Sequence, residues 1–267
     1  MPKKFSVLSW NVEHFRLPSK NVPGIIVHIR RFDPDILAIY EVEGKQVYEH
    51  MVSSFPGYNF HITEGPQTQE ILLGVRGIFT AFYTQRLEFK TGNDFLRPGA
   101  LLSLRLDSQD YSLLFLHTRS FPEPIGFGTR DSQFAHAFSL KKTLDKVAGG
   151  TGKARFIIVG DLNVMGMEYP FDRDIRPQIE LQKMQRDAKR RKMRILTKNY
   201  EQTWTDGKRF SDLDHVLASE NLSFTKWDSN AEVDVSGWRE HLPSDATGFR
   251  DFIRKVSDHN SLYFEVT

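Results

Sequence analysis

Carboxylate, amide and imidazole side chains follow apolar runs at several places in this chain. The clearest case is the segment RFIIVGDLNVMG, in which four apolar residues precede Gly160 and the pair Asp161 and Asn163. Residues two apart in an extended chain share a face, so this pair would lie together while Leu162 points into the core. The spacing predicts a polar pair just past the carboxyl end of a buried strand, where sheet proteins commonly place their chemistry. A turn in which Gly, Asp and Asn satisfy backbone groups is the structural alternative.

Six further polar side chains lie at the ends of other predicted strands. Each has a structural explanation of its own, as a turn cap, a solvated loop acid or a buried core histidine. Taken together, acidic and amide oxygens with imidazole are the groups expected around magnesium or manganese with acid–base histidines. The chain has no cysteine, so any metal must be bound by oxygen and imidazole. The six are Asn11, Glu41, His117, Asp214, Asp258 and His259.

Short apolar runs separated by turn signals predict the strands that would position these groups. The runs 113–116 and 156–159 are apolar throughout, which predicts central strands buried on both faces. The predicted strands are 5–12, 35–42, 70–75, 78–84, 100–106, 111–118, 155–163, 213–219 and 261–266.

Four segments have helical patterns, at 23–32, 44–55, 130–150 and 176–196. In the third, Phe134, Phe138 and Leu144 recur near helical spacing, and a glycine pair at 149–150 is a suitable stop. Strands with interspersed helices indicate a layered α/β (α+β) domain.

The composition sets outer limits on the organisation of the chain. Its 267 residues contain no Gly/Ser-rich or Pro-rich linker and no fixed repeat, so we expect a single domain over 1–267. An apolar strand pattern begins almost at once, without a signal-peptide core, and no apolar run approaches the ~18 residues of a membrane span. We therefore expect a cytoplasmic protein, and we expect a monomer. The net charge of +2 does not by itself indicate a polyanionic partner.

Five motifs, SWNV, YEVEG, GDLNV, DLDHVL and SDHNSLYFEV, resemble those of the endonuclease/exonuclease/phosphatase superfamily and occur in its order. That superfamily includes pancreatic-type deoxyribonucleases, abasic-site endonucleases, inositol polyphosphate 5-phosphatases and neutral sphingomyelinases. The resemblance runs from Ser9 to Val266. It implies a four-layer αββα sandwich, with two packed mixed β-sheets flanked by helices and the site at one end.

The resemblance also implies roles for the polar residues. Glu41 would be the main carboxylate for Mg²⁺, with Mn²⁺ as an alternative, and Asn11 and Asp258 would bind the metal or support it. Asp161 would orient or deprotonate the attacking water, and His259 would bond a phosphate oxygen or act as the general base, so the choice of base between the two stays open. The remaining roles are a phosphate contact for Asn163, orientation of His259 by Asp214, and phosphate contact or leaving-group assistance for His117.

Several departures from family patterns bear on the substrate. Tyr40 stands where many relatives have glutamine, and the segment LHTRS lacks the tyrosine of abasic-site endonucleases. The segment RFSDLDHVL lacks the Pro-Trp-Asp-Arg signature of the 5-phosphatases. Glu70 is a candidate acidic partner for His117, as in deoxyribonuclease-like members, or else an exposed strand-edge glutamate.

Two basic segments are candidates for contact with a polynucleotide. Asp174–Leu196 holds eight basic residues, including Arg190 and Arg191, around a predicted helical face. The segment RSFPEPIGFGTRD places Arg119 and Arg130 among phenylalanines, which suits backbone contact with base stacking. A solvated helix face and ordinary loop packing are the respective alternatives.

The sequence therefore predicts a Mg²⁺-dependent phosphodiesterase, with a nuclease favoured over a phosphatase and nucleic acid as the substrate. The alternative is a phosphomonoesterase or phospholipase-like hydrolase of a small phosphorylated molecule. A catalytically inactive binding module is disfavoured because every expected catalytic position holds a competent residue. The choices between DNA and RNA and between endo- and exo-action stay open at this point.

Overall fold

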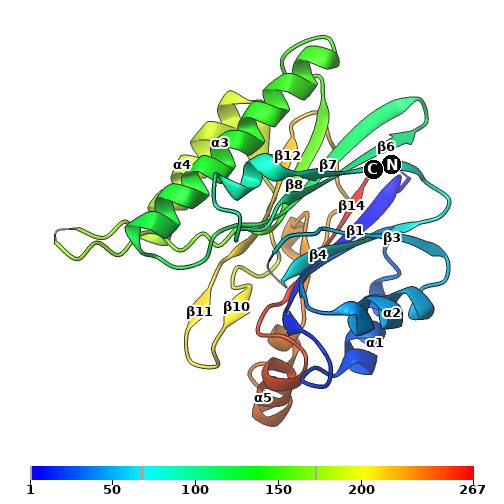
Figure 1. The fold of residues 1–267 in the computed structure, drawn as a ribbon, viewed down its shortest axis with the longest axis vertical. Coiled ribbons are helices and arrows are strands. Elements are labelled where there is room, and N and C mark those ends of the chain that lie inside the picture. The colour runs from blue at the N-terminus through cyan, green and yellow to red at the C-terminus, as the bar shows by residue number, and fades with distance from the viewer. Residues whose placement is uncertain (1, 67–68, 172) are drawn as a thin grey trace. The chain divides into compact units, whose positions relative to one another are not determined.

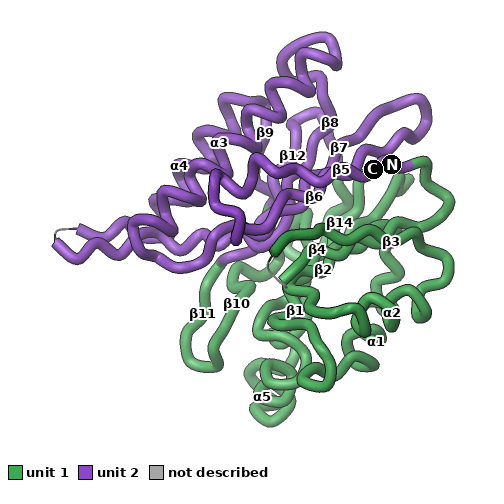
Figure 2. Tube along the Cα trace, in the orientation of Figure 1, with its two compact units in different colours: residues 1–80, 197–212, 224–267 green, residues 81–196, 213–223 purple. Residues whose placement is uncertain are grey.

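The computed structural model describes residues 2–66, 69–171 and 173–267, and these form two compact units (Figure 2). The first unit comprises Met1–Thr80, Thr197–Asp212 and Phe224–Thr267, and the second comprises Ala81–Leu196 and Leu213–Ser223. Each unit is built on one six-stranded sheet and carries its own helices (Figure 1).

The sheet of the first unit has the strand order β13-β14-β1-β2-β4-β3. The strands β1 and β2 run parallel and are connected through α1, whereas the other neighbours pair antiparallel. A small hairpin of β10 and β11 belongs to the same unit. The strands are β1 (Phe5–Phe15), β2 (Ile36–Val42), β3 (Tyr58–Ile62), β4 (Glu70–Arg76), β10 (Trp204–Thr205), β11 (Phe210–Ser211), β13 (Asp234–Ser236) and β14 (Ser261–Val266).

The first unit has three α-helices, α1 (Val22–Phe32), α2 (Lys45–Ser54) and α5 (Ala246–Lys255), and the short 3-10 helices η2 (Asp228–Asn230) and η3 (Trp238–His241). The side chain of Asn21 caps α1 by accepting a hydrogen bond from the Gly24 amide at 3.2 Å. Ile29 of α1 and Met51 of α2 share one buried apolar cluster with Leu37 of β2. Burial of these apolar faces attaches both helices to the sheet.

The sheet of the second unit has the strand order β5-β6-β7-β8-β12-β9. Here β7 and β8 are parallel, while β6 and β12 pair antiparallel with them. Phe134 of α3 and Met184 of α4 pack in one apolar cluster with Phe156 and Ile158 of β8. The elements are β5 (Thr80–Arg86), η1 (Leu87–Lys90), β6 (Gly99–Leu106), β7 (Gln109–His117), α3 (Pro124–Val147), β8 (Arg155–Asp161), α4 (Pro177–Arg190), β9 (Met193–Ile195) and β12 (Asp214–Ser219).

The predicted fold class is confirmed, since two mixed six-stranded sheets are flanked by helices in an α+β fold. All nine predicted strands are present, and β7 and β8 are central in their sheet as predicted. The expectation of a single domain stays a prediction. No described helix is long and apolar enough to cross a membrane.

Two helix boundaries differ from the sequence prediction by six residues each. The helix α3 begins at Pro124, six residues earlier than predicted, so part of the supposed loop after Arg119 is helical. Proline suits a first helical position, and Gly126 is there for packing, since a Cβ atom at that position would lie 2.3 Å from the Phe121 carbonyl oxygen. The helix α4 ends at Arg190, and β9 follows it. The prediction missed β3, β9, β10, β11, β13 and α5, of which β9, β10, β11 and β13 are only two or three residues long.

Candidate active site

The first unit gathers Asn11 and Glu41 at the carboxyl ends of the parallel strands β1 and β2. Asn11 pairs in register with Tyr40, and the register then shifts at a bulge before Phe15. Glu41 lies between Tyr40 and Val42, the two β2 residues that flank this register shift, and it has a positive φ of 60°. Residues other than glycine seldom adopt this backbone conformation. A bulge of this kind re-aims a side chain. The backbone at Glu41 therefore has an unfavourable conformation, and this conformation sets the direction of the Glu41 side chain.

Both oxygens of the Glu41 carboxylate are held by donors in the first unit. The Asn11 side-chain amide donates to Oε1 at 3.1 Å, and the His14 backbone amide donates to Oε2 at 2.9 Å. The Gln69 amide adds a third hydrogen bond at 3.2 Å. The orientation of this carboxylate is consequently set before any ligand binds.

Three tryptophan indoles hold the segment that carries Asp258 and His259. The Trp204 indole donates to Asp258 Oδ2 at 2.6 Å, and the Trp238 indole donates to the Asp258 carbonyl at 2.9 Å. The Trp10 indole, from the SWNV motif, donates to the His259 carbonyl at 3.0 Å. Sequence reasoning missed Trp204 and Trp238, because nothing in their local sequence indicates what they bind.

Ser257 connects this segment to the end of β1. Its hydroxyl donates to the Asn11 carbonyl at 2.6 Å and accepts from the His259 amide at 2.9 Å. Asn11, Glu41, Asp258 and His259 thus belong to one hydrogen-bonded group, which we call the first cluster.

Burial raises the pKa of Asp258 to about 6, although the nearby charge of His259 opposes that rise. The carboxylates of Glu13 and Glu41 raise the pKa further by repulsion. Asp258 Oδ1 is buried and accepts no hydrogen bond from the described residues. A carboxylate oxygen without a donor, among other carboxylates, fits a hard divalent cation, which would relieve the repulsion. The residues present are therefore suitable for Mg²⁺ or Mn²⁺.

The second unit places His117, Asp161 and Asp214 in one row across three adjacent strands. His117 at the end of β7 is in register with Asp161 at the end of β8, which in turn faces Asp214 at the start of β12. His117 Nε2 lies 3.5 Å from Asp161 Oδ2, and carboxylate oxygens of Asp161 and Asp214 lie within 4.8 Å of each other. All three side chains are buried.

Asn163 completes the group that we call the second cluster: His117, Asp161, Asn163 and Asp214. Its φ of 47° turns the chain directly after β8, so its amide N–H reaches Asp161 Oδ1 at 3.1 Å. The Asn163 side chain donates to the Thr118 carbonyl at 3.2 Å, while Leu162 between the two polar residues is buried as predicted. Sequence reasoning passed over Thr118, whose buried hydroxyl has no hydrogen-bond partner in the described chain. Its only sequence signal is its position directly after His117.

Other predicted residues lie outside these clusters. Glu70 accepts a hydrogen bond from the Thr63 hydroxyl at 2.5 Å, and its pairing with His117 stays a prediction. Tyr40, at the position where relatives have glutamine, is fully buried, and its hydroxyl lies 3.1 Å from the Ser9 hydroxyl. The Arg119 guanidinium lies 5.5 Å from the centre of the Phe121 ring, and Phe121 is exposed.

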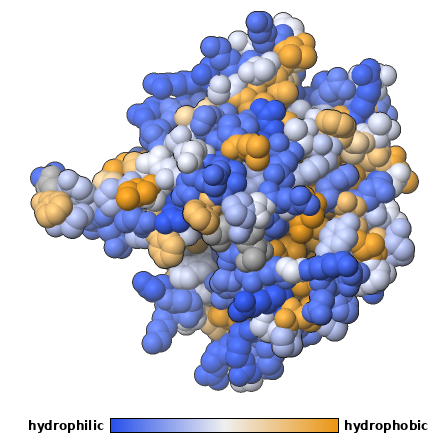
Figure 3. All heavy atoms as spheres, in the orientation of Figure 1, coloured by the Kyte–Doolittle hydropathy of each residue, from blue (hydrophilic) through white to orange (hydrophobic). Residues whose placement is uncertain are grey.

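Arg190 is the last residue of α4, and Arg191 directly follows it. On the face shown in Figure 3, hydrophilic and hydrophobic side chains are interspersed. The Arg190 side chain is 71% exposed and makes a 3.4 Å ion pair with Asp187, whereas Arg191 is partly buried. Both stay candidates for contact with a polyanion.

The structure corrects the prediction that Arg130 contacts the backbone of a polynucleotide. Its side chain is 0% exposed and pairs with Glu180 at 2.8 Å, so it cannot reach the backbone of a polynucleotide. The segment looked like an exposed loop because of its proline and glycine content. Residues 124–131 of this segment instead form the first turns of α3, and the Arg130 side chain is buried there.

Residues 8–259 match the model of the Endonuclease/Exonuclease/phosphatase family. A search of curated proteins finds no significant match. Among solved structures, truncated Caenorhabditis elegans TDP2 is 17% identical with a TM-score of 0.66, over 98% of this chain and 97% of that one. D. rerio TDP2 complexed with single strand DNA product is 15% identical with a TM-score of 0.68, over 98% of both chains. The mannosyl-6-phosphatase Bt3783 of Bacteroides thetaiotaomicron VPI-5482 is 14% identical with a TM-score of 0.60, over 99% of this chain and 100% of that one. At these identities the structural likeness concerns the fold.

Proposed function

Because the chain belongs to the endonuclease/exonuclease/phosphatase family, whose members hydrolyse phosphoester bonds, we propose that it is a Mg²⁺-dependent phosphodiesterase that cleaves nucleic acid. The observation that carries this proposal is the complete set of acidic, amide and imidazole groups in the two clusters. Nucleic acid is favoured over a small substrate by the exposed arginines of α4, which suit a long polyanion.

In this proposal Glu41, Asn11 and Asp258 hold the Mg²⁺ ion. The ion supplies positive charge to the phosphoryl oxygens, which lowers the barrier to attack on an anionic phosphodiester. The fixed orientation of Glu41 removes the need to reorganise this ligand when the metal binds.

Asp161 orients the attacking water, and it or His259 accepts the proton. The Asn163 amide uses one N–H on the Thr118 carbonyl and has a second N–H for a phosphoryl oxygen. His117, which lies 3.5 Å from Asp161, would either contact phosphate or protonate the leaving oxygen. The orientation of His259 by Asp214 stays a prediction from the family resemblance.

A second candidate function is hydrolysis of a small phosphorylated molecule. The mannosyl-6-phosphatase with the same fold is the observation that favours it.

A substrate panel distinguishes the two candidates. Wild type and Asp161→Ala are incubated with plasmid, single-stranded DNA, RNA and inositol phosphates, in Mg²⁺ or in EDTA. We expect cleavage of nucleic acid by wild type in Mg²⁺ only, and none by Asp161→Ala. The matched control is Asp110→Ala, which removes an exposed carboxylate at the other end of β7 and should retain activity. Phosphate release from the small substrates alone would overturn the nuclease proposal.

A further inference from the structure

Arg130 lies in the second turn of α3 and forms a buried ion pair with Glu180 of α4. Its Nε donates to Glu180 Oε1 at 2.8 Å, and Nη2 donates to Oε2 at 3.1 Å. The two side chains are 0% and 4% exposed. This is a bidentate arrangement in which a planar guanidinium fits a carboxylate edge to edge.

The remaining N–H groups of Arg130 bind backbone in two loops. Nη1 donates to the carbonyls of Phe121 at 2.8 Å and Arg119 at 3.3 Å, in the loop that follows His117 and β7. Nη2 also donates to the Gly166 carbonyl at 2.7 Å, in the loop that follows Asn163 and β8. One side chain thus binds the two segments that leave the second cluster.

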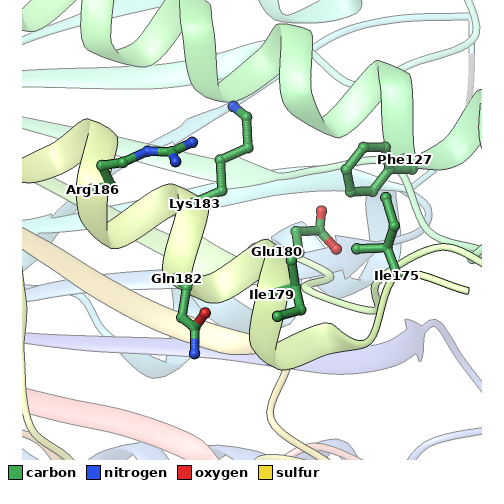
Figure 4. A pocket seen from close by; sticks show the side chains of 7 residues that line it. All are labelled: Phe127, Ile175, Ile179, Glu180, Gln182, Lys183 and Arg186. Carbon is green, nitrogen blue, oxygen red and sulfur yellow. The ribbon is translucent and has the colours of Figure 1, made fainter.

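Glu180 fixes the second of these loops from the other side. Its Oε2 accepts the Gly166 amide at 2.6 Å, so both backbone groups of Gly166 are bound by the ion pair. Figure 4 shows the Glu180 carboxylate on the side of α4 that faces Phe127 and Ile175. A Cβ atom at Gly166 would lie 2.0 Å from the Ile175 carbonyl oxygen, and Gly166 has a φ of 74°. Only glycine allows this approach.

A buried ion pair is weak evidence for stability, because removing both charges from water offsets much of their attraction. What this pair contributes is geometry, since it satisfies five hydrogen bonds from Arg130 to fixed acceptors. The same two loops are also joined by Asn163, whose side chain binds the Thr118 carbonyl. Displacement of either loop would therefore move a residue of the second cluster.

We propose that Arg130 and Glu180 are positioning residues, which hold the loops after β7 and β8 so that His117 and Asn163 keep their catalytic geometry. The catalytic part of this inference rests on the proposed phosphoesterase function. The structural part, that the pair holds the loops, does not.

The chain offers a matched control on the same helix. Lys141 of α3 is also 0% exposed, and it pairs with Asp145 at 2.5 Å. Asp145 accepts the Ala154 amide at 2.9 Å, so this pair also ties down a loop, the one that enters β8 rather than leaves it. Lys141→Met and Arg130→Met therefore remove equally buried cations at opposite ends of one helix.

The experiment compares Arg130→Met, Arg130→Lys and Lys141→Met with wild type by steady-state kinetics and by amide hydrogen exchange. We expect Arg130→Met to lower kcat about 10²-fold with KM changed by less than about threefold, since misplacement of catalytic groups by about 1 Å has an effect of that size. Residues 118–123 and 164–168 should exchange faster in this variant. Arg130→Lys should have a kcat between those of Arg130→Met and wild type. Lys141→Met should have nearly the same kcat as wild type, and nearly the same exchange rates in both segments.

Two results would overturn the inference: unchanged exchange in both segments of Arg130→Met, or an equal loss of kcat in Lys141→Met. Where Arg130→Met does not fold, Glu180→Gln provides the test, since it keeps the shape of the acceptor and removes its charge. If wild type cleaves no phosphoester, the proposed function fails, while hydrogen exchange still decides whether the pair holds the loops.

Discussion

The first and second clusters are fixed in different ways. In the first, side chains from distant parts of the sequence do the holding, above all the indoles of Trp10, Trp204 and Trp238. In the second cluster, backbone pairing between strands holds the residues, since His117, Asp161 and Asp214 occupy one register across three paired strands. The geometry of the first cluster can therefore be changed by substituting single side chains, whereas the geometry of the second changes only if its sheet or the adjoining loops move.

The two clusters contain the same kinds of groups, but their carboxylates have different surroundings. In the first, burial raises the pKa of Asp258 to about 6, and Asp258 Oδ1 accepts no hydrogen bond from the described residues. In the second, Asp161 Oδ1 accepts the Asn163 amide at 3.1 Å, and Asp161 Oδ2 lies 3.5 Å from His117 Nε2. This difference supports a division of labour in which the first cluster binds the metal and the second handles water and phosphate.

The largest expected effect tests that division. Glu41→Gln and Asp161→Asn should each lower kcat about 10³-fold, because each removes a charge used in the reaction while keeping the shape of the side chain. The Mg²⁺ concentration for half-maximal activity should rise in Glu41→Gln and stay unchanged in Asp161→Asn. The measurement is initial rate against Mg²⁺ concentration.

Asp107→Asn, at an exposed turn, serves as the control for loss of a carboxylate. Equal shifts in the Mg²⁺ requirement of both variants would show that the clusters share the metal, and the proposed division would be wrong.

The next effect is a loss of folding stability at low pH, caused by a histidine that contacts Trp10, one of the indoles that hold the first cluster. The ring of His28 packs against Trp10 in a tilted arrangement with centroids 4.5 Å apart, and burial lowers the pKa of His28 from 6.5 to about 4. The unfolded chain takes up this proton near pH 6.5, but the folded chain does so only near pH 4. His28 therefore does not change the free energy of unfolding above pH 6.5. As the pH falls from 6.5 to 4, protonation of His28 in the unfolded chain should lower the free energy of unfolding by about 3 kcal/mol.

Urea unfolding of wild type and His28→Gln at pH 7.5, 5.5 and 4.5 measures this effect. The pH dependence should be flatter in His28→Gln, and the exposed His50→Gln on α2 should behave as wild type. Parallel curves for wild type and His28→Gln would rule out His28 as the source of acid sensitivity.

A smaller effect tests the indole donors directly. Trp204→Phe keeps an aromatic ring but removes the 2.6 Å hydrogen bond to Asp258, and kcat should fall about tenfold, in line with the loss of one hydrogen bond to a charged group. The control is Trp227→Phe in the same unit, whose indole N–H has no hydrogen-bond partner in the described chain. If both substitutions have the same effect on kcat, packing rather than the hydrogen bond supports the first cluster.

The smallest effect concerns the surface beyond both clusters. Arg190→Glu with Arg191→Glu should weaken polynucleotide binding at low salt and reduce the slope of log K against log salt concentration by about 2, one for each lost phosphate contact. The measurement is fluorescence anisotropy with labelled single-stranded DNA at several salt concentrations. Lys45→Glu, a highly exposed lysine of α2, is the charge control. Equal affinity of wild type and the double variant at low salt would remove α4 as a contact surface.

The second cluster could be predicted from the sequence further than the first. The apolar runs before His117 and Asp161 predicted two central strands, and the spacing of Asp161 and Asn163 predicted a polar pair past a strand end. Both signals are local, because strand period and burial are read from neighbouring residues. The alignment of the two strands is then a consequence of sheet pairing.

The support of the first cluster was not predictable in this way. The positive φ of Glu41 goes against residue preference, and the bulge in β1 has no glycine to indicate it. Trp204 and Trp238 lie 54 and 20 residues from the Asp258 they bind, so only the folded chain reveals their partners. Arg130 shows the opposite error, since a local pattern of proline and glycine indicated a loop where the chain forms the first turns of α3, in which the Arg130 side chain is buried.

The backbone of Glu41 has a consequence for engineering this protein. A left-handed conformation costs about 1 kcal/mol for residues other than glycine. Glu41→Gly would remove that cost, together with the carboxylate that accepts hydrogen bonds from Asn11, His14 and Gln69. A library selected only for heat resistance does not constrain this position, and under the proposed function it would lose a metal-binding carboxylate wherever glycine is tolerated there. Engineering based on that proposal should hold Glu41 fixed and look for added stability elsewhere.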